Sequence, residues 1–498
     1  MRQLLLGLDI GSSSIKASMV DASTGQCLAS GQSPAEELDM IAVQTGWAEQ
    51  DPDLWWHHLV IAVKSCIQKS GARAEDVQAI GISYQMHGLV VVDKNRQPLR
   101  PSIIWCDSRA VSIGQKANAA LGEEYCLQHL LNSPGNFTAS KLRWVKENEP
   151  ALFEKIHKIM LPGDYIAMRL SGEINTTDTG LSEGMFWDYQ SQSVSEKLLD
   201  HYGFSKSLLA DLVPVFAIQA TLNGEAAGQL GLKPGTKIAY RAGDQPNNAF
   251  SLNVLNPGET AATAGTSGVI YSVTEKNAFD PKSRVNTFIH VSNRSDKPAN
   301  GVLLCINGTG ILNSWLRRNI RGAGAPLDYE QMNRLASGVA IGSDGLVILP
   351  FGNGAERILE NRSISASIHG LDFNHHTQAH LFRAAQEGIV FALKYGFDVL
   401  QDMGLKTSVI RAGHANMFLS SVFREAFVNT IGAPLELYNT DGATGAAIGA
   451  GVGAGIFSSE EDAFKGLKTI KVETPDREMA DAYQSAYDKW KSQLNQIL

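Results

Sequence analysis

Residues 9–21 read DIGSSSIKASMVD and place an aspartate and a glycine-serine turn between two apolar segments near the start of the chain. Residues 4–8 hold four leucines and no charge, which is typical of a strand buried on both faces. Residues 15–20 alternate less cleanly, but they fit the returning strand of a hairpin. The tip, residues 11–14, has no bulky side chain, so backbone N–H groups and serine hydroxyls can approach phosphate oxygens.

Asp9 follows the buried strand and would point toward whatever the tip binds. A carboxylate repels phosphate unless a cation lies between them, so this pair predicts a phosphate group with its Mg²⁺. Asp9 is therefore the candidate metal ligand, and Gly11, Ser12 and Ser13 are candidate phosphate-binding residues. An ordinary glycine-serine hairpin with a solvated aspartate explains this single stretch equally well.

A second stretch of the same design, residues 261–273 (AATAGTSGVIYSV), favours the functional interpretation. Small residues lead into Gly265, Thr266 and Ser267, and an apolar strand leaves the turn. Two such loops half a chain apart predict two domains of similar design that face each other across a cleft, with one loop on each side of a nucleotide's phosphates.

Composition limits the classes of protein that fit the chain. It has 498 residues, 44% hydrophobic and 19% charged, which predicts a soluble globular protein with two domains of somewhat over 200 residues each. The net charge of -8 argues against nucleic acid or an anionic membrane surface as the main partner, because both require a basic surface.

The cysteines and the apolar segments predict a cytoplasmic location. Five cysteines lie far apart without metal-ligand spacing, which indicates reduced thiols. The N-terminus lacks the pattern of a signal peptide. The longest weakly polar run, residues 442–457, is rich in glycine and alanine and is too short for a membrane span, so no membrane partner is expected.

Apolar strands alternate with amphipathic helices, which predicts an α/β architecture. The clearest helix covers residues 52–70, where Asp51 caps the start and Gly71 ends it. Two strands follow at residues 79–83 and 88–93. Further helices are expected at residues 141–148, 151–158, 386–403, 418–431 and 479–498.

Polar side chains after two of these strands form a candidate binding site for a polyhydroxylated ligand. His87 follows the strand at residues 79–83, and Trp105, Asp107 and Arg109 follow another apolar run. A structural histidine and a surface ion pair between Asp107 and Arg109 are alternatives of similar weight.

Asp244 lies at the exit of a strand at residues 238–242, and we place the domain boundary here, giving domains 1–246 and 247–498. In the second domain, residues 441–446 open a helix with so little side-chain bulk that a flat ligand or another helix could lie on it.

Four histidines, at positions 369, 375, 376 and 380, invite comparison with metal sites. Their spacing matches no helical ligand pair such as H-E-x-x-H, so we interpret all four as solvated loop residues.

These segments together resemble the FGGY family of carbohydrate kinases over essentially the whole chain. The segments that carry the resemblance are DIGSSSIKASMVD, GWAEQDPDLWW, ISYQMHGLVVVD, IIWCDSRA, GDQPNNA, TAGTSGV and NTDGATGAAIGAG. The resemblance implies the two-domain actin-like ATPase fold, related to ribonuclease H. Each domain would be a mixed sheet flanked by helices, with the active site in the interdomain cleft.

The QMHG and W-x-D-x-R motifs are closer to the branch of the family that phosphorylates D-xylulose than to the glycerol branch. This implies transfer of the γ-phosphate of ATP to the 5-hydroxyl of D-xylulose, with Mg²⁺ present. Other sugars or polyols (ribulose, gluconate, glycerol) remain alternatives, as does an ATP-switched interaction protein of the actin or Hsp70 type. By analogy with relatives a homodimer is expected.

The family's functional positions carry over residue by residue. The resemblance implies Asp244 as the catalytic base and Met86, His87 and Gln245 as sugar-pocket residues. It also implies that three positions contact adenosine: Trp315, Gly413 and Asn416. Residues 411–413 depart from the family's usual glycine run, and Arg411 and Ala412 there would crowd the adenine side.

Overall fold

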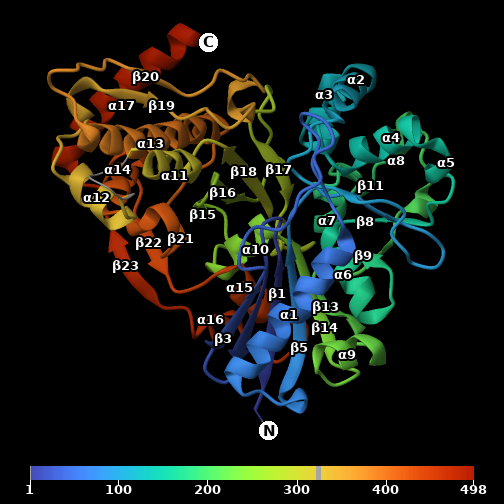
Figure 1. Ribbon diagram of the computed structural model, residues 1–498. Helices are drawn as coiled ribbons and strands as arrows, with labels where there is room; N and C mark the ends of the chain where they lie inside the picture. Colours follow the sequence, from blue (N-terminus) through green and yellow to red (C-terminus); the bar gives the residue numbers. More distant parts are fainter. Residues whose placement is uncertain (1, 321–326) are drawn as a thin grey trace. The chain divides into compact units, whose positions relative to one another are not determined.

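The computed structural model describes residues 2–320 and 327–498, and its chain folds into two compact units (Figure 1). Unit 1 consists of Met1–Asn253, Phe288–Asn300 and Thr440–Leu467, and unit 2 of Val254–Thr287, Gly301–Asn439 and Lys468–Leu498. This division differs from the single boundary expected between residues 246 and 247. The helix Gly442–Gly453 belongs to unit 1, although it lies late in the sequence, because its small side chains allow it to pack closely on the main sheet of that unit.

The main sheet of unit 1 has six strands, and its three central strands are parallel. The β1–β2, β2–β3 and β13–β14 pairs are antiparallel. In spatial order the strands are β13 (Phe216–Thr221), β14 (Lys237–Gly243), β5 (Val77–Tyr84), β1 (Leu4–Ile10), β2 (Ile15–Asp21) and β3 (Gln26–Ser33).

The helices of unit 1 are α1 (Pro52–Ser70), α2 (Val111–Leu121), α3 (Glu123–Tyr125), α4 (Thr138–Asn148), α5 (Pro150–Phe153), α6 (Pro162–Ser171), α7 (Asp178–Glu183), α8 (Glu196–Tyr202), α9 (Gly224–Leu230), α10 (Asp244–Ser251), α15 (Gly442–Gly453) and α16 (Glu460–Phe464). Its shorter strands are β4 (Glu49–Gln50), β6 (Val90–Val92), β7 (Ser102–Ile103), β8 (Lys158–Met160), β9 (Asn175–Thr176), β10 (Trp187–Asp188), β11 (Ser193–Val194) and β12 (Asp211–Leu212).

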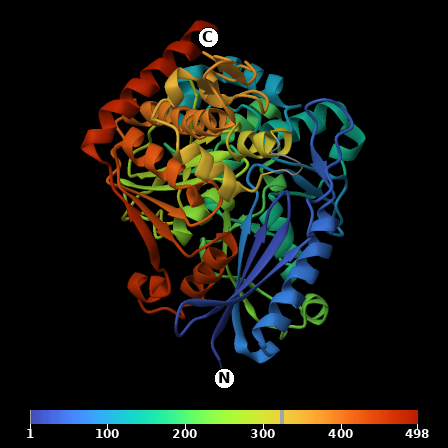
Figure 2. The ribbon, with the colours of Figure 1, turned by 60° about the vertical axis from the view of Figure 1, so that its left-hand side comes forward.

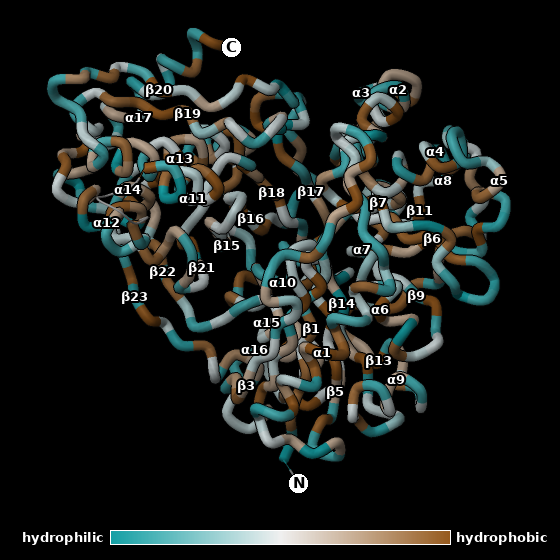
Figure 3. The backbone as a smooth tube through the Cα atoms, viewed as in Figure 1, coloured by the Kyte–Doolittle hydropathy of each residue, from teal (hydrophilic) through white to brown (hydrophobic). Residues whose placement is uncertain are grey.

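Helix α1 has the limits that the sequence predicts. The Asp51 side chain accepts a hydrogen bond from the N–H of Asp53, and Gly71 takes the left-handed conformation (φ 61°) that ends the helix. Its apolar face covers one side of the sheet, where it packs with Leu4, Leu6 and other even-numbered residues of β1 in a continuous hydrophobic core. The strands of this sheet are mainly hydrophobic in Figure 3.

The opposite face of the same sheet is covered by α15, as Figure 2 shows with α1 on one side of the strands and the red C-terminal helices on the other. Gly7 and Gly81 are neighbours in the β1–β5 register and lie beneath this helix. A Cβ on Gly7 would lie 1.8 Å from the carbonyl oxygen of Ala443, and one on Gly81 would lie 1.9 Å from that of Ala446. Backbone therefore packs on backbone where the sheet covers α15. Another helix also lies on its small residues, as the sequence allows: a Cβ on Gly445 would lie 2.4 Å from Cβ of Ser251 in α10.

The main sheet of unit 2 repeats this design. Strands β15 and β21 are parallel, as are β21 and β22, whereas the β15–β16 and β22–β23 pairs are antiparallel. The strands in order are β17 (Asn286–Ile289), β18 (Asn300–Ile306), β16 (Gly268–Thr274), β15 (Glu259–Ala264), β21 (Val409–Gly413), β22 (Leu435–Tyr438) and β23 (Thr469–Glu473). The β15–β16 hairpin thus stands where β1–β2 stands in unit 1.

The helices of unit 2 are α11 (Gly310–Asn319), α12 (Tyr329–Ser337), α13 (Gln378–Asp402), α14 (Ser421–Ile431) and α17 (Arg477–Ile497), and a two-stranded sheet joins β19 (Val347–Leu349) to β20 (Ser367–His369). Single helical turns across both units are η1 (Ala74–Asp76), η2 (Cys126–Leu130), η3 (Lys206–Leu208), η4 (Ser343–Gly345), η5 (Arg357–Leu359) and η6 (Asn416–Leu419).

Three sequence predictions about local structure need correction. The helix expected at residues 151–158 ends at Phe153, because Lys158–Met160 pairs with β6 as strand β8. Helix α13 begins at Gln378, eight residues before the predicted start, and buries Phe382 and Ala385 in its first turns. His380 therefore lies on a helix, and His369 lies on β20, whereas we had expected both in solvated loops.

No helix among residues 2–320 and 327–498 is long and apolar enough to span a membrane.

Candidate active site

Two aspartates lie at the carboxyl ends of the three central parallel strands of unit 1. Asp9 pairs in register with Ser83 of β5, whose hydroxyl donates a hydrogen bond of 3.0 Å to Oδ1 of Asp9. Asp244 follows β14 directly and is the first residue of α10. Strand β5 separates β1 from β14, and the carboxyl ends of parallel strands meet at one sheet edge, so both carboxylates belong to the same edge.

The side chains of Met86 and Glu183 pack closely against Gly243, the residue before Asp244, because glycine has no Cβ. A Cβ at this position would lie 2.5 Å from Oε2 of Glu183 and 2.6 Å from Cγ of Met86. Met86 and Glu183 are both buried against this glycine, with 5% and 1% of their surfaces exposed. The predicted sugar-side residue Met86 is thus held next to the predicted base.

The electrostatics of this edge favour proton uptake. Burial and the charge of Asp9 raise the pKa of Asp244 to about 7. Burial also raises the pKa of Asp9, and Asp441 adds to this effect, although Lys16 and Ser83 oppose it. Burial, together with the Asp244 charge, raises the pKa of Glu183 well above its usual value. Asp244 can therefore exchange a proton near neutral pH, as a general base requires.

The N-termini of two helices adjoin these carboxylates. The side-chain amide of Asn247 in α10 donates a 2.9 Å hydrogen bond to the carbonyl of Gly442, the first residue of α15. A Cβ on Gly442 would lie 2.8 Å from Oδ2 of Asp9, so Asp9 sits at the start of α15, where Asp441 caps the helix by accepting from Thr444. Helix N-termini carry partial positive charge and favour anions.

Gln245 offers a hydrogen-bond acceptor beside Asp244. Its Oε1 atom is buried and has no partner among the residues that the structure describes. A buried amide oxygen without a partner is costly unless a ligand or water completes it. This free acceptor suits the hydroxyl of a sugar, the role that the sequence predicts for Gln245.

His87 is held in an aromatic enclosure. Its backbone is left-handed (φ 60°), an unusual conformation for a non-glycine residue, and its Nδ1 lies 3.0 Å from the carbonyl oxygen of Glu183. The ring lies 4.9 Å from that of Phe137 and 5.2 Å from that of Phe288, measured between centroids. Strain of this kind is concentrated at functional sites.

Lys141 and Glu183 contact predicted site residues, and sequence reasoning gave neither of them a role. The buried ammonium of Lys141 donates 2.9 Å hydrogen bonds to the carbonyls of His87 and Ile104, and so joins the two loops predicted to bind sugar. Burial lowers its pKa to about 8. The sequence signal for Glu183 is weak, because Glu183 lies within a polar, glycine-containing segment, residues 175–184, that does not directly follow a predicted strand.

Trp105 contacts the first hairpin tip. Its indole N–H donates a 3.2 Å hydrogen bond to the hydroxyl of Ser12, and 43% of its surface is exposed. A residue expected on the sugar side and one expected on the phosphate side are therefore neighbours. Gly11 and Ser13 stand on either side of Ser12, and the tip is closed by a hydrogen bond from the N–H of Gly11 to the carbonyl of Ser14.

Asp107 is engaged in a structural network. Its carboxylate accepts from the N–H of Ala48 (2.6 Å) and from the guanidinium of Arg109, which also pairs with Glu49. The Arg109 guanidinium lies 3.8 Å from the ring centroid of Trp47. The sequence left open a surface ion pair between Asp107 and Arg109; the pair is present, but it is buried, not on the surface. Its hydrogen bonds engage the carboxylate that was predicted to bind substrate.

The second predicted phosphate loop lies in unit 2 and supports a helix. The carbonyl of Gly265 accepts from the N–H of Gly310, and that of Thr266 accepts from the N–H of Ile311. The N-terminus of α11 thus adjoins the turn that ends with Ser267. Trp315, half exposed on the same helix, is the aromatic side chain predicted to contact adenosine.

Gly413 and Asn416 lie near this loop. Gly265 directly follows β15, and Gly413 is the last residue of β21. Because β15 and β21 are parallel neighbours, both glycines lie at the same sheet edge. The Nδ2 atom of Asn416 is 3.5 Å from where a Cβ of Gly265 would be, and Asn416 is left-handed (φ 54°). Arg411 forms ion pairs with Glu259 and Glu436 on the neighbouring strands, which orients its guanidinium along the sheet.

Comparisons with known proteins agree with this architecture. Residues 4–251 match the N-terminal domain of the FGGY family of carbohydrate kinases, and residues 260–454 match its C-terminal domain. A xylulose kinase of Bacillus subtilis (strain 168) is 29% identical over 498 residues, which covers 98% of this chain and 96% of the relative.

Two solved structures extend the comparison. The xylulose kinase of Rhodospirillum rubrum is 26% identical, with a TM-score of 0.85 and coverage of 99% of this chain and 98% of that one. The gluconate kinase of Lactobacillus acidophilus is 23% identical with a TM-score of 0.87 over 99% and 98% of the two chains, and it shares the fold. The chain thus belongs to the FGGY family of carbohydrate kinases, has their actin-like ATPase fold, and is a sugar kinase.

Proposed function

We propose that this kinase transfers the γ-phosphate of ATP to the 5-hydroxyl of D-xylulose, giving D-xylulose 5-phosphate and ADP, with Asp244 as the general base. The choice of D-xylulose is supported by relatives named xylulose kinase, among them the Bacillus subtilis protein that aligns with nearly the whole chain. The QMHG motif, which contains Met86 and His87, supports the same choice.

The observation that carries the base assignment is the environment of Asp244. Its carboxylate is partly buried at the carboxyl end of the sheet, and its pKa is raised to about 7 by burial and by Asp9. In the reaction, the 5-hydroxyl loses its proton to Asp244 as its oxygen bonds to the γ-phosphorus. The bond from that phosphorus to the bridging oxygen breaks, and ADP leaves with the electron pair.

The residues at this edge fit the Mg²⁺ that the family implies. Asp9 and Asp244 repel each other, as the raised pKa of Asp244 indicates, and a divalent cation would relieve this repulsion. Asp9 is the residue that we propose to hold the ion, with Asp441 nearby. When bound, Mg²⁺ neutralises charge on the transferred phosphoryl group.

The remaining assignments follow from the type of each residue. The turns at Gly11–Ser13 and Gly265–Ser267 are proposed to bind phosphate oxygens through backbone N–H and hydroxyl groups. The free Oε1 of Gln245 and the enclosed ring of His87 are proposed to bind sugar hydroxyls, and Trp105 to pack against the sugar. Trp315, Gly413 and Asn416 are proposed for adenosine.

A coupled ADP-release assay over a panel of acceptors tests the substrate. With saturating Mg²⁺ and ATP, we expect kcat/KM for D-xylulose to exceed that for D-ribulose, D-gluconate and glycerol by about tenfold or more, because pocket hydrogen bonds discriminate between hydroxyl patterns. A higher kcat/KM for another acceptor would reassign the substrate. If no acceptor stimulated ADP release above the basal rate, the ATP-switched interaction protein would become the better explanation of the nucleotide loops.

A further inference from the structure

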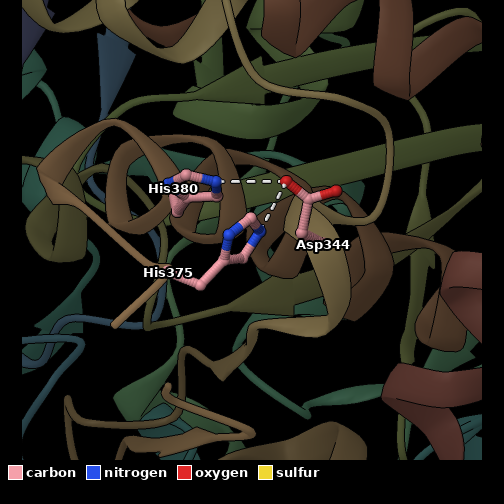
Figure 4. A group of neighbouring side chains, drawn as sticks. All are labelled: Asp344, His375 and His380. Carbon is pink, nitrogen blue, oxygen red and sulfur yellow. Dashed lines mark hydrogen bonds and ion pairs between the residues drawn. The ribbon is translucent and has the colours of Figure 1, made fainter. Parts of the chain in front are cut away.

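Three side chains of unit 2 converge at a site that uses none of the residues of the candidate active site (Figure 4). The Nε2 atom of His380 lies 3.2 Å from Oδ2 of Asp344, and the Nε2 atom of His375 lies 3.4 Å from the same oxygen. One ligand atom from each of the three side chains lies within 4.8 Å of the others. Such convergence of two imidazoles and one carboxylate is a donor set for a transition-metal ion.

Asp344 reaches the two histidines from a turn whose backbone conformation is unfavourable. Gly342, Ser343, Asp344 and Gly345 all have positive φ angles, of 81°, 49°, 50° and 94°. Left-handed backbone suits glycine but is costly at Ser343 and Asp344. The conformation is fixed from the interior, where Glu387 accepts from the N–H of Gly342 (3.1 Å) and from the hydroxyl of Ser343 (3.3 Å).

The turn directs the side chains of Ser343 and Asp344 to opposite sides. Ser343 is completely buried and faces Glu387, whereas Asp344 is exposed and faces the histidines. The carboxylate is therefore aimed at His375 and His380 before any ion binds. Preorganised ligands lose less conformational entropy on binding.

Neighbouring side chains orient the imidazoles. The N–H of Thr377 donates a 3.1 Å hydrogen bond to Nδ1 of His380, and the hydroxyl of Thr377 lies 3.1 Å from the same atom, so the ring is fixed with Nε2 toward Asp344. A bound ion would replace the Nε2 proton. His376 plays a supporting part, because its Nδ1 accepts from the N–H of Asp372 (2.9 Å) and its Nε2 faces the carbonyl of Asp344 at 3.4 Å. His376 thus buttresses the turn that carries Asp344.

We propose that Asp344, His375 and His380 bind a divalent ion of the zinc type through one carboxylate oxygen and two Nε2 atoms, with water at the fourth position. The distances agree with this geometry. A tetrahedral ion bonded at about 2.0–2.1 Å places its ligand atoms roughly 3.3–3.4 Å apart. Imidazole ligands favour zinc, copper or nickel over the Mg²⁺ that serves ATP, which prefers oxygen.

The ion would have a structural effect on unit 2. It would join the turn at residues 342–345 to the start of α13, the long central helix of the unit. Because it binds the folded chain and not the unfolded one, it would raise the melting temperature.

Metal titration of the chelator-treated full chain, free of any histidine tag, tests the proposal. We expect calorimetry to show one equivalent of Zn²⁺ bound, and Co²⁺ to give the visible absorption of a tetrahedral site. His375→Ala and Asp344→Asn should each weaken Zn²⁺ binding at least about tenfold. His369→Ala is the matched control. The ring of His369 is hydrogen-bonded to the hydroxyl of Ser367 on β20 and lies outside the cluster, so Zn²⁺ affinity should be unchanged.

His375 is exposed, so its replacement leaves the fold intact, and a melting curve of the metal-free variant that matches the wild type verifies this. The wild-type melting temperature should rise with Zn²⁺, and that of His375→Ala should rise much less. Absence of saturable binding to the wild type would overturn the proposal. So would an affinity unchanged from the wild type in both ligand variants, or a sulfur-to-cobalt charge-transfer band, which would place the ion on cysteine thiols.

Discussion

At the scale of single residues, the chain concentrates negative charge where a stable fold alone would avoid it. Asp9, Asp244 and Glu183 lie at one sheet edge, and each has a pKa raised by burial. Proteins keep such arrangements where chemistry requires them, and remove them where it does not. The position of Asp244 at a strand exit was legible in the sequence, whereas Glu183 reaches it only through tertiary packing against Gly243.

Replacing Asp244 should stabilise the metal-free protein in neutral solution. The pKa of Asp244 is about 7 in the folded chain, compared with 3.8 for an ordinary aspartate, which we take for the unfolded chain. At a pH between these two values, the folded protein keeps a proton that the unfolded chain has released. Folding therefore becomes less favourable as the pH rises from about 4 to about 7.

Above pH 7 we expect Asp244→Asn to unfold at a higher temperature than the wild type. The free energy of unfolding should increase by on the order of 1–2 kcal/mol. This is less than the full pKa shift of Asp244 would give, because the side chain is partly exposed and solvent screens its charge. Near pH 4 the difference should vanish. Calorimetry with EDTA across this range measures it, and a variant less stable than the wild type at pH 8 would contradict the electrostatic account.

Trp105 and Asp107 should respond to mutation in different ways, although they are two residues apart. Asp107→Ala removes the buried carboxylate that accepts from the N–H of Ala48 and from the guanidinium of Arg109, and we expect a loss of about 3–5 kcal/mol in the free energy of unfolding. Trp105→Ala removes an exposed side chain, so stability should change by less than about 0.5 kcal/mol while KM for the sugar rises.

Urea denaturation and initial-rate kinetics on the two variants check this contrast. An Asp107→Ala variant of normal stability but raised KM would show that this carboxylate binds the sugar directly. The sequence could not decide between these roles, because Ala48, Glu49 and Trp47, which surround the Asp107–Arg109 pair, lie some 60 residues earlier in the chain.

At the scale of secondary-structure elements, the sequence predicted helices best where local capping decides them. Asp51 and Gly71 bound α1 as expected. The start of α13 was placed too late because its first turn is polar and depends on Thr377 and on burial of Phe382, which only packing reveals. Lys158–Met160 forms a strand because β6 is there to pair with it.

Close packing of α15 on the sheet predicts a large effect of adding one methyl group. In Gly81→Ala the new Cβ would lie 1.9 Å from the carbonyl oxygen of Ala446, and backbone must move to accommodate it. We expect a loss of about 3 kcal/mol or more in the free energy of unfolding. Because α15 carries Asp441 at its start, phosphoryl transfer should fall as well.

Gly228→Ala is the matched control for this change. Gly228 lies within α9, has no atom within 4 Å of the added Cβ, and does not have a positive φ. Alanine should therefore stabilise the protein by up to about 1 kcal/mol. Urea denaturation of both variants measures the difference, and similar stabilities would disprove backbone contact between α15 and β5.

At the scale of the whole molecule, the repeated hairpin predicted a repeated domain. In each main sheet an antiparallel hairpin, β1–β2 or β15–β16, adjoins two further parallel strands and an antiparallel edge strand. The contiguous division at residue 246 missed the return of the chain to unit 1 at residues 440–467. Nothing local in NTDGATGAAIGAG tells which sheet its small residues cover. The complementary glycines, Gly7 and Gly81, are over 350 residues away.

A fragment of residues 1–253 should therefore fail to fold cooperatively. Without α15, one face of β1, β5 and β14 is exposed, and burial of apolar surface is the main stabilising contribution. We expect a broad thermal transition and binding of a hydrophobic dye. A sharp transition near that of the intact protein would show that α15 is dispensable.

The most direct test of the account is turnover and binding in Asp244→Asn. We predict that kcat with D-xylulose falls roughly 100-fold or more, because the hydroxyl proton has no acceptor, while calorimetry shows sugar and nucleotide affinities close to those of the wild type. The wild-type kcat/KM should rise with pH to a plateau, with an apparent pKa no higher than about 7, because bound Mg²⁺ relieves the repulsion by Asp9 that helps to raise the pKa of Asp244. Near-normal turnover in Asp244→Asn would contradict the central claim that this carboxylate is the base.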